Sequence, residues 1–158
     1  MRWWCSIYQI YNNKNHVKPQ NNFLSIITNQ ADADIYIDDN YVGQKEVFKS
    51  FPIGSSHTWR IECNLYHSES GNITITDQEN IINKTLRPAY GYLKVTSLPE
   101  NGALVYIDNK KVGVTPYISD KLASGSYKIR IMKEMFKTVE QTFEVTDGDT
   151  TNVRLNMP

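Results

Sequence analysis

The chain has 158 residues, with 17 basic and 17 acidic side chains and therefore no formal net charge at pH 7. This balance argues against nucleic-acid binding driven by phosphate neutralisation, which needs an excess of Lys and Arg. Hydrophobic residues make up 40% and charged residues 22%, as in folded domains and unlike a disordered chain. Ten Tyr, three Trp and five Phe favour strands and turns over helices.

The first residues of the sequence do not match a secretory signal peptide. Met1–Tyr8 holds one positive charge and two tryptophans but lacks the apolar core and cleavage site of a secretory signal. No stretch approaches the 18 or more apolar residues that a membrane helix requires. Two cysteines, Cys5 and Cys63, are too few for a disulfide scaffold, so we expect two thiols, with a single bridge between them as the alternative.

The first half of the chain predicts a series of short strands. Leu24–Ile27 opens it, and we expect Ile35–Ile37 to pair with this strand. Trp59–Cys63 is predicted to be the central strand, and the next is supplied by Ile73 and Ile75. Turn residues separate these segments, which is typical of an all-β domain.

The second half of the sequence shows the pattern of short strands more clearly. Leu93, Val95 and Ser97 alternate with polar residues, the period of a half-buried strand. The turn Pro99–Gly102 then breaks the chain. A further strand is predicted at Val105–Ile107, followed by a tight turn and a short antiparallel strand that ends at Gly113. The remaining strands are predicted at Ser126–Met132, at Thr142–Thr146 and around Val153 and Leu155.

The two halves are copies of each other. Ala33–Asp38 reappears as Ala103–Asp108, an offset of 70 residues. The same offset relates Val42-Gly43 to Val112-Gly113, Arg60-Ile61 to Arg130-Ile131, Leu65-Tyr66 to Met135-Phe136, and Thr76-Asp77 to Thr146-Asp147. A register kept over more than fifty residues predicts two tandem domains. We place the first copy at residues 23–88 and the second at 91–158, after an N-terminal segment of residues 1–22 left from an upstream region.

The second copy resembles a PEGA domain. The residues that carry the resemblance are Pro99, Gly102, Ala103, Tyr106, Asp108, Gly113, Thr115, Pro116, Gly125 and Tyr127. Asn101 is an insertion in the name-giving Pro-Glu-Gly-Ala turn, and the first copy is a divergent version that keeps Ala33, Tyr36, Asp38 and Gly43. The resemblance implies two small β-sandwiches, immunoglobulin- or transthyretin-like, with no shared catalytic activity.

Physical chemistry gives these signature residues structural roles. We expect positive φ at Gly102 and Gly113, since glycine adopts it without steric cost. Pro116 should lie at an edge or at the start of a strand, because it cannot donate to a ladder. Tyr106 and Tyr127 should place their rings on or near the core, with hydroxyls that reach water.

Few residues are candidates for catalysis, metal binding or sugar binding. Ser56 and His57 point to opposite faces of a strand, so we expect no nucleophile–base pair there or with nearby Ser55. Cys63 and His67 have a spacing that metal sites use, without the remaining paired ligands, so we expect no metal and no cofactor. Tyr41, Trp59, Tyr66 and Tyr90 are candidates for stacking on sugars, although core or inter-repeat packing is the favoured interpretation.

The resemblance predicts a non-catalytic tandem module of a bacterial cell-envelope or surface protein. It would act as a spacer, or bind cell-wall glycan or another envelope protein, without contacting nucleic acid. The alternatives are a carbohydrate-binding module and an accessory domain of a larger enzyme or kinase. Because each copy closes at an equivalent Pro, Pro88 and Pro158, we also expect the chain to belong to a longer tandem array.

Overall fold

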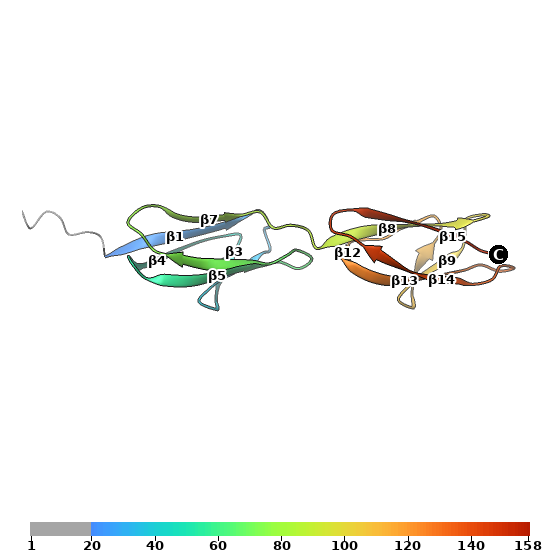
Figure 1. Cartoon of the computed structure of the whole chain (residues 1–158), viewed down its shortest axis with the longest axis horizontal. Coiled ribbons are helices and arrows are strands. Elements are labelled where there is room, and N and C mark those ends of the chain that lie inside the picture. The colour runs from blue at the N-terminus through green and yellow to red at the C-terminus, as the bar shows by residue number, and fades with distance from the viewer. Residues whose placement is uncertain (1–19) are drawn as a thin grey trace, which may run out of the picture. The chain divides into compact units, whose positions relative to one another are not determined.

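The computed structural model describes residues 20–158, which form fifteen strands and no helix (Figure 1). This part of the chain separates into two compact units. Unit 1 runs to Ile61 and resumes over Glu69–Thr85, and unit 2 comprises Glu62–Ser68 and Leu86–Pro158. Each unit is a pair of sheets, so the predicted all-β fold of two small sandwiches is confirmed.

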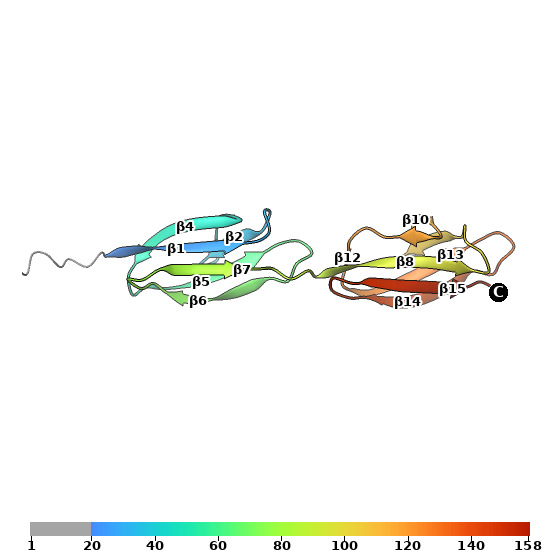
Figure 2. The ribbon, with the colours of Figure 1, turned by 90° about the horizontal axis from the view of Figure 1, so that it is seen from above.

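In unit 1, the first sheet has β1 (Asn21–Thr28) at its centre. β4 (Glu46–Pro52) pairs with it in antiparallel orientation, and β7 (Asn80–Lys84) pairs in parallel on the other side (Figure 2). The second sheet has the order β3 (Asn40–Gln44), β2 (Asp34–Ile37), β5 (Ser56–Glu62), β6 (Glu69–Thr74), with β5 in its interior as predicted.

The predicted pairing of Ile35–Ile37 with Leu24–Ile27 is wrong. β2 bonds to β3 and β5, whereas both edges of β1 are taken by β4 and β7. Leu24 and Ile26 of β1 and Ile35 of β2 are all fully buried, because the two strands contribute apolar side chains to the core from opposite sheets. Hydrophobic alternation predicts each strand but does not say which strands share a sheet.

Unit 2 has the same plan. β8 (Tyr90–Leu98) pairs in parallel with β15 (Thr150–Asn156), and in antiparallel orientation with β11 (Tyr117–Ile118) and β12 (Leu122–Ala123). The opposite sheet has the order β10 (Lys110–Val114), β9 (Leu104–Ile107), β13 (Gly125–Met132), β14 (Val139–Val145). β11 and β12 together occupy the place of the single strand β4 in unit 1.

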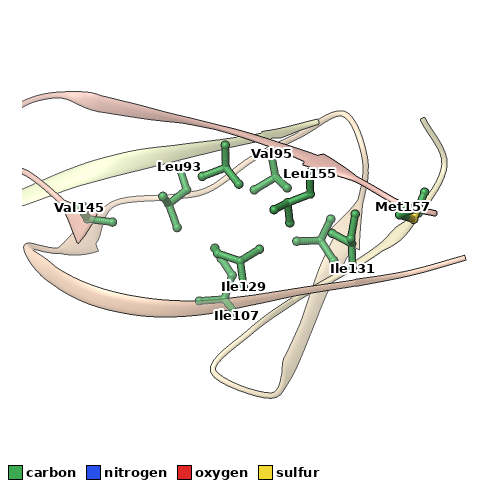
Figure 3. Packing of buried hydrophobic residues seen from close by; sticks show 11 residues of the cluster. Leu93, Val95, Ile107, Ile129, Ile131, Val145, Leu155 and Met157 are labelled. Atoms are coloured by element: carbon green, nitrogen blue, oxygen red, sulfur yellow. The ribbon is translucent and has the colours of Figure 1, made fainter. Parts of the chain in front are cut away.

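The core of unit 2 lies between these sheets (Figure 3). Leu93, Val95 and Leu155 point inward from β8 and β15, towards Ile129 and Ile131 of β13. The predicted inward alternation of β8 is therefore confirmed. Complete burial of each such aliphatic side chain contributes about 1.5–3 kcal/mol of transfer free energy.

The signature residues act on the backbone of this sandwich. Asp108 has φ 46° and its Oδ1 accepts a hydrogen bond from the N–H of Lys128 at 2.9 Å. Asp38 does the same for the N–H of Thr58 in unit 1. These carboxylates tie the β2–β3 and β9–β10 turns to the neighbouring strands, so their role is structural in both copies.

The aromatic and proline signature residues also support the framework. The prediction that the ring of Tyr106 lies on or near the core is wrong, because Tyr106 alternates on β9 with the buried Val105 and Ile107. Its ring lies instead under the guanidinium of Arg130, with 4.6 Å from Cζ to the ring centroid. Tyr127 packs against the core of unit 2, as predicted. The hydroxyl of Tyr127 donates to the carbonyl of Ala123 at 2.7 Å. Pro116 is exposed and directly precedes β11, the strand-start position that was expected.

Two glycines are needed for different reasons. Gly102 has φ 92°, as predicted. Gly113 does not have positive φ, so that prediction is wrong. A Cβ on Gly113 would lie 2.8 Å from the ring of Tyr117, and the close approach of this ring explains the glycine.

Thr115 provides the first stability prediction. It is 3% exposed, and its Oγ1 lies 2.6 Å from Ser97 Oγ and accepts the N–H of Ala103 at 3.0 Å. Thr115→Val leaves that buried N–H without its partner, so unit 2 should lose about 1–3 kcal/mol in urea denaturation. The exposed Thr142→Val on β14 is the control and should change the free energy of unfolding by less than about 0.5 kcal/mol.

Candidate functional site

Three polar side chains of unit 1 form a hydrogen-bonded chain that the sequence did not predict. Asp38 Oδ2 lies 2.6 Å from His57 Nδ1, and His57 Nε2 lies 2.8 Å from Ser55 Oγ. The imidazole is mostly buried, with the ring of Phe51 at 3.9 Å between centroids. Ser55 directly precedes β5 and is two residues from His57, so both can point to the same side, and this spacing was the available signal in the sequence.

The geometry of the hydrogen-bonded set Asp38, His57 and Ser55 opposes nucleophilic catalysis by Ser55. The hydroxyl of Ser55 donates to the carbonyl of Pro52 at 2.6 Å, so its single proton points away from the imidazole. A hydroxyl whose proton is held by a backbone carbonyl is not oriented to pass that proton to the imidazole, as general-base activation of a serine requires. The chain instead fixes the β2–β3 turn to β5.

This arrangement predicts a pH dependence for unit 1. The hydrogen bond from His57, followed by that from the N–H of Thr58, holds the pKa of Asp38 below its ordinary value of 3.8. A carboxyl with a lowered folded-state pKa contributes stability that is present above pH 3.8 and lost as pH falls through the lower value. Wild-type unit 1 should therefore weaken below about pH 4, and Asp38→Asn should weaken it at pH 6 and flatten this acid dependence.

Tryptophan emission measures this effect in unit 1 specifically. All three tryptophans, Trp3, Trp4 and Trp59, precede residue 62, and Trp59 lies in the core of unit 1. Urea midpoints taken between pH 3 and 6 in a Trp3→Phe, Trp4→Phe background isolate Trp59. Equal slopes for Asp38→Asn and its parent would contradict the prediction.

The four aromatic residues that were candidates for sugar stacking comprise one buried ring, one exposed ring and one pair of rings in contact. Trp59 is 8% exposed and covers Gly71, where a Cβ would lie 2.8 Å from the indole. Tyr41 is exposed on β3 and makes an edge contact with Tyr36. Tyr66 and Tyr90 belong to unit 2 and contact each other edge to face, with ring centroids 5.8 Å apart. Of the four residues, only Tyr41 is more than half exposed.

A different set of exposed apolar residues gathers on the outer face of the β4–β1–β7 sheet. Leu24, Ile26 and Thr28 point into the core, so the alternate residues of β1 point outward. Phe23 and Phe48 are 63% and 60% exposed, and Ile81 is 54% exposed. We call these three side chains, with Ser25 and Ile27 between them, the apolar face.

Strand register places these residues side by side. Ser25 pairs with Phe48 of β4 on one side and with Ile81 of β7 on the other. Ser25 is itself 8% exposed, which fits a position between large neighbours. Large exposed side chains that are contiguous mark interaction surfaces more often than isolated ones do.

In the equivalent face of unit 2, polar and charged side chains replace most of these residues, and Ile118 is the large apolar exception. In register, Lys94 takes the place of Ser25, with Ile118 on one side and Asn152 on the other. Thr96 takes the place of Ile27 and pairs with Arg154. A shallow hollow of about 430 Å³ on this face is lined by Lys94, Thr96, Ser97, Leu98, Asn101, Asn152, Val153 and Arg154. The two copies therefore share a fold and differ in the surface that this sheet presents.

Among residues 20–158, neither a cluster of metal-ligating side chains nor a membrane-spanning helix is present. Within residues 20–158, no three His, Cys, Asp or Glu side chains lie close enough together to hold a metal ion. Cys63 is half-buried after β5, His67 Nε2 lies 2.6 Å from Asp147 Oδ2, and Cys5 lies outside the described residues. No helix in that part of the chain is long and apolar enough to cross a membrane.

The fold, with two successive copies of one small β-sandwich, defines a tandem module. The PEGA domain model matches the chain twice, at residues 22–89 and 90–158. The chain therefore belongs to the PEGA domain family, a family of non-catalytic modules. The resemblance inferred from the turn and strand residues is confirmed.

The other comparisons add little. No curated protein matches the sequence. Among solved structures, the chain is similar to the Bacillus anthracis TIE protein, with 16% sequence identity and a TM-score of 0.43. The similarity covers 87% of this chain and 34% of that protein's chain.

Proposed function

We propose that the chain is a non-catalytic module of a bacterial cell-envelope or surface protein, in which the first copy binds another protein and the second acts as a spacer. The observation that carries the binding role is the apolar face of unit 1. Its three large side chains are each more than half exposed, and they lie in adjacent registers of one sheet. Membership of the PEGA family supports the envelope part of this proposal.

The chemistry of the apolar face favours a protein partner over a glycan. Apolar side chains without convergent hydrogen-bond donors and acceptors suit the hydrophobic centre of a protein interface. Sugar recognition uses aromatic rings together with polar groups. Of the candidate rings, Trp59 is buried, and only Tyr66 and Tyr90 contact each other, edge to face and both partly buried. The hydrogen bond from the Ser55 hydroxyl to the carbonyl of Pro52 supports a non-catalytic role.

The matched positions of the two copies provide the experiment. The full chain, its Phe23→Ser/Phe48→Ser variant and an Ile118→Ser control are immobilised and exposed to a bacterial envelope protein extract. Ile118 is 65% exposed and occupies in unit 2 the register position of Phe48. We expect capture of the same protein by the wild type and the control, and at least tenfold less capture by the double variant.

A parallel arm uses purified peptidoglycan and envelope polysaccharide. Retention of the wild-type chain on either, unchanged by Phe23→Ser/Phe48→Ser, would replace protein binding by the carbohydrate-binding alternative. Equal protein capture by all three chains would also contradict the proposal. Because Phe23 and Phe48 are exposed, their replacement should leave the fold intact, which circular dichroism checks.

A further inference from the structure

A hollow of about 440 Å³ lies within unit 2, where the edge strand β10 of one sheet faces β11 and β12 of the other. Its walls are apolar side chains and two tyrosine rings from both sheets: Ile107, Val112, Leu122, Tyr117 and Tyr127. Ile107 is 7% exposed, and the other four side chains are partly buried. This volume and this lining are typical of a site for a small molecule.

Charged side chains form the rim of this hollow. Asp108, Lys110 and Asp120 line it and are exposed, so the rim carries two negative charges against one positive charge. Burial, followed by the negative charge of Asp120, raises the pKa of Tyr117. Burial, followed by the charge of Asp108, raises the pKa of Tyr127. Each tyrosine therefore has a carboxylate close to its hydroxyl.

The residue before Asp120 fixes the position of that carboxylate. Ser119 is 5% exposed, and its N–H donates to the carbonyl of Leu93 at 2.9 Å. The Oγ of Ser119 accepts the N–H of Leu93, also at 2.9 Å. These two bonds tie the connection between β11 and β12 to β8. The backbone that carries Asp120 is therefore held in place at the hollow.

The first copy provides an internal partner for the carboxylate that corresponds to Asp108. This residue is Asp38, whose Oδ2 lies 2.6 Å from the ring nitrogen Nδ1 of His57. By the 70-residue offset, Tyr127 takes the place of His57, and its hydroxyl donates to a main-chain carbonyl instead. Among residues 20–158, the Asp108 carboxylate keeps only the hydrogen bond from the N–H of Lys128. The second copy thus has the carboxylate without the nitrogen donor, and a hollow beside it.

We propose that this hollow binds a primary ammonium group on a short alkyl chain, as in a free aliphatic amine or the side chain of a lysine. The carboxylates of Asp108 and Asp120 would accept hydrogen bonds from the ammonium group, and the rings of Tyr117 and Tyr127 would attract its charge. The alkyl chain would cover the apolar wall. This site goes beyond the spacer role proposed for the second copy, and it does not use the apolar face of the first copy.

The affinity for a small amine should be modest. A ligand such as n-butylammonium has few atoms with which to bury surface, and the two carboxylates stand at an exposed rim. We therefore expect a dissociation constant of about 1 mM for n-butylammonium. Because the charges are close to solvent, binding should weaken as the salt concentration rises from about 0.05 to about 0.5 M.

An amide NMR titration of the full chain with n-butylammonium chloride, up to about 20 mM at pH 7, tests the proposal. The signals of residues around the hollow should shift and saturate. The alcohol n-butanol has the same alkyl chain without the charge and should bind about tenfold more weakly or not at all. A lysine blocked at both main-chain ends distinguishes the two sources. Binding of both amines assigns the hollow to lysine side chains, and binding of n-butylammonium alone assigns it to free amines.

Variants at the rim separate the charges that attract the ligand from the charge that repels it. Asp120→Asn should weaken the binding of n-butylammonium about fivefold, and Lys110→Gln should strengthen it about threefold. Glu134→Gln removes an exposed carboxylate of unit 2 that does not line the hollow, so it is the matched control and should leave the affinity unchanged. All three side chains are exposed, so their replacement should leave the fold intact, which the amide spectrum of each variant verifies.

Three results would overturn the proposal. They are the absence of any shift around the hollow with either amine, binding of n-butanol as tight as that of n-butylammonium, and equal affinities of Asp120→Asn and Glu134→Gln. None of these results concerns the capture of a protein by the apolar face of the first copy, which the Phe23→Ser/Phe48→Ser variant tests separately.

Discussion

Replacing Gly91 with alanine should destabilise unit 2 by about 3 kcal/mol. A Cβ at this position would lie 2.3 Å from the carbonyl oxygen of Thr146 and 2.7 Å from that of Asp149. Both atoms belong to the backbone, and the turn is held to β8 because the N–H of Gly148 donates to Tyr90 and that of Tyr92 to Asp149. Neither carbonyl can move without breaking these bonds, so the cost should be at the upper end for overpacking.

Gly148 in the same turn provides the control. Its φ is 70°, and a Cβ there would meet nothing within 4 Å. Asparagine tolerates this backbone region, so Gly148→Asn should cost less than about 1 kcal/mol. Urea denaturation followed by hydrogen exchange of unit 2 peptides measures both variants, and the Trp59 emission of unit 1 should stay unchanged. Similar losses for the two variants would contradict the steric explanation.

Replacing Ile129 with alanine should cost unit 2 about 3–4 kcal/mol. Ile129 is fully buried at the centre of β13 and points towards the β8 side of the core (Figure 3). Large-to-small changes at such sites lose the transfer free energy of the removed atoms and leave a cavity that closes only in part. A domain of about 70 residues has only a few kcal/mol of stability in total, so the variant should be largely unfolded in unit 2 at 37 °C.

The exposed Ile118 makes the matched control for this substitution. Ile118→Ala should change the unfolding free energy of unit 2 by less than about 0.5 kcal/mol, because Ile118 is 65% exposed. Hydrogen exchange of β8 and β13 peptides reports the loss directly. Full protection of these strands in Ile129→Ala would show that the core is not organised around this residue.

Sequence reasoning predicted the fold because its signals are local. The alternation of Leu93, Val95 and Ser97 predicted a strand. The recurrence of Ala33–Asp38 at Ala103–Asp108 predicted two copies of one domain, and the turn residues within the second copy indicated the family. Sheet membership was not predicted correctly, since whether β2 pairs with β1 depends on how the chain crosses the core and not on the alternation of either strand. The glycine at 113 was also misinterpreted, because the approach of Tyr117 is a tertiary contact.

The candidate site was less predictable than the fold. The Asp38–His57–Ser55 hydrogen-bonded chain joins the β2–β3 turn to β5 and the residue before it, and only the Ser55–His57 spacing was visible in the sequence. The apolar face depends on register, because Phe23, Phe48 and Ile81 come from three strands that are adjacent only in the sheet. Trp59 was a candidate for sugar stacking only because it is aromatic. Its burial against Gly71 is a tertiary contact that the sequence does not reveal.

Hydrogen exchange on the full chain, with and without the envelope protein that it captures, tests the central claim most directly. If the first copy binds through its apolar face, peptides from Asn21–Thr28 and Glu46–Pro52 should gain protection in the complex. The equivalent strands of the second copy, Tyr90–Leu98 and Tyr117–Ile118, should exchange as before. Protection of the second copy's strands without that of Asn21–Thr28 would contradict the account.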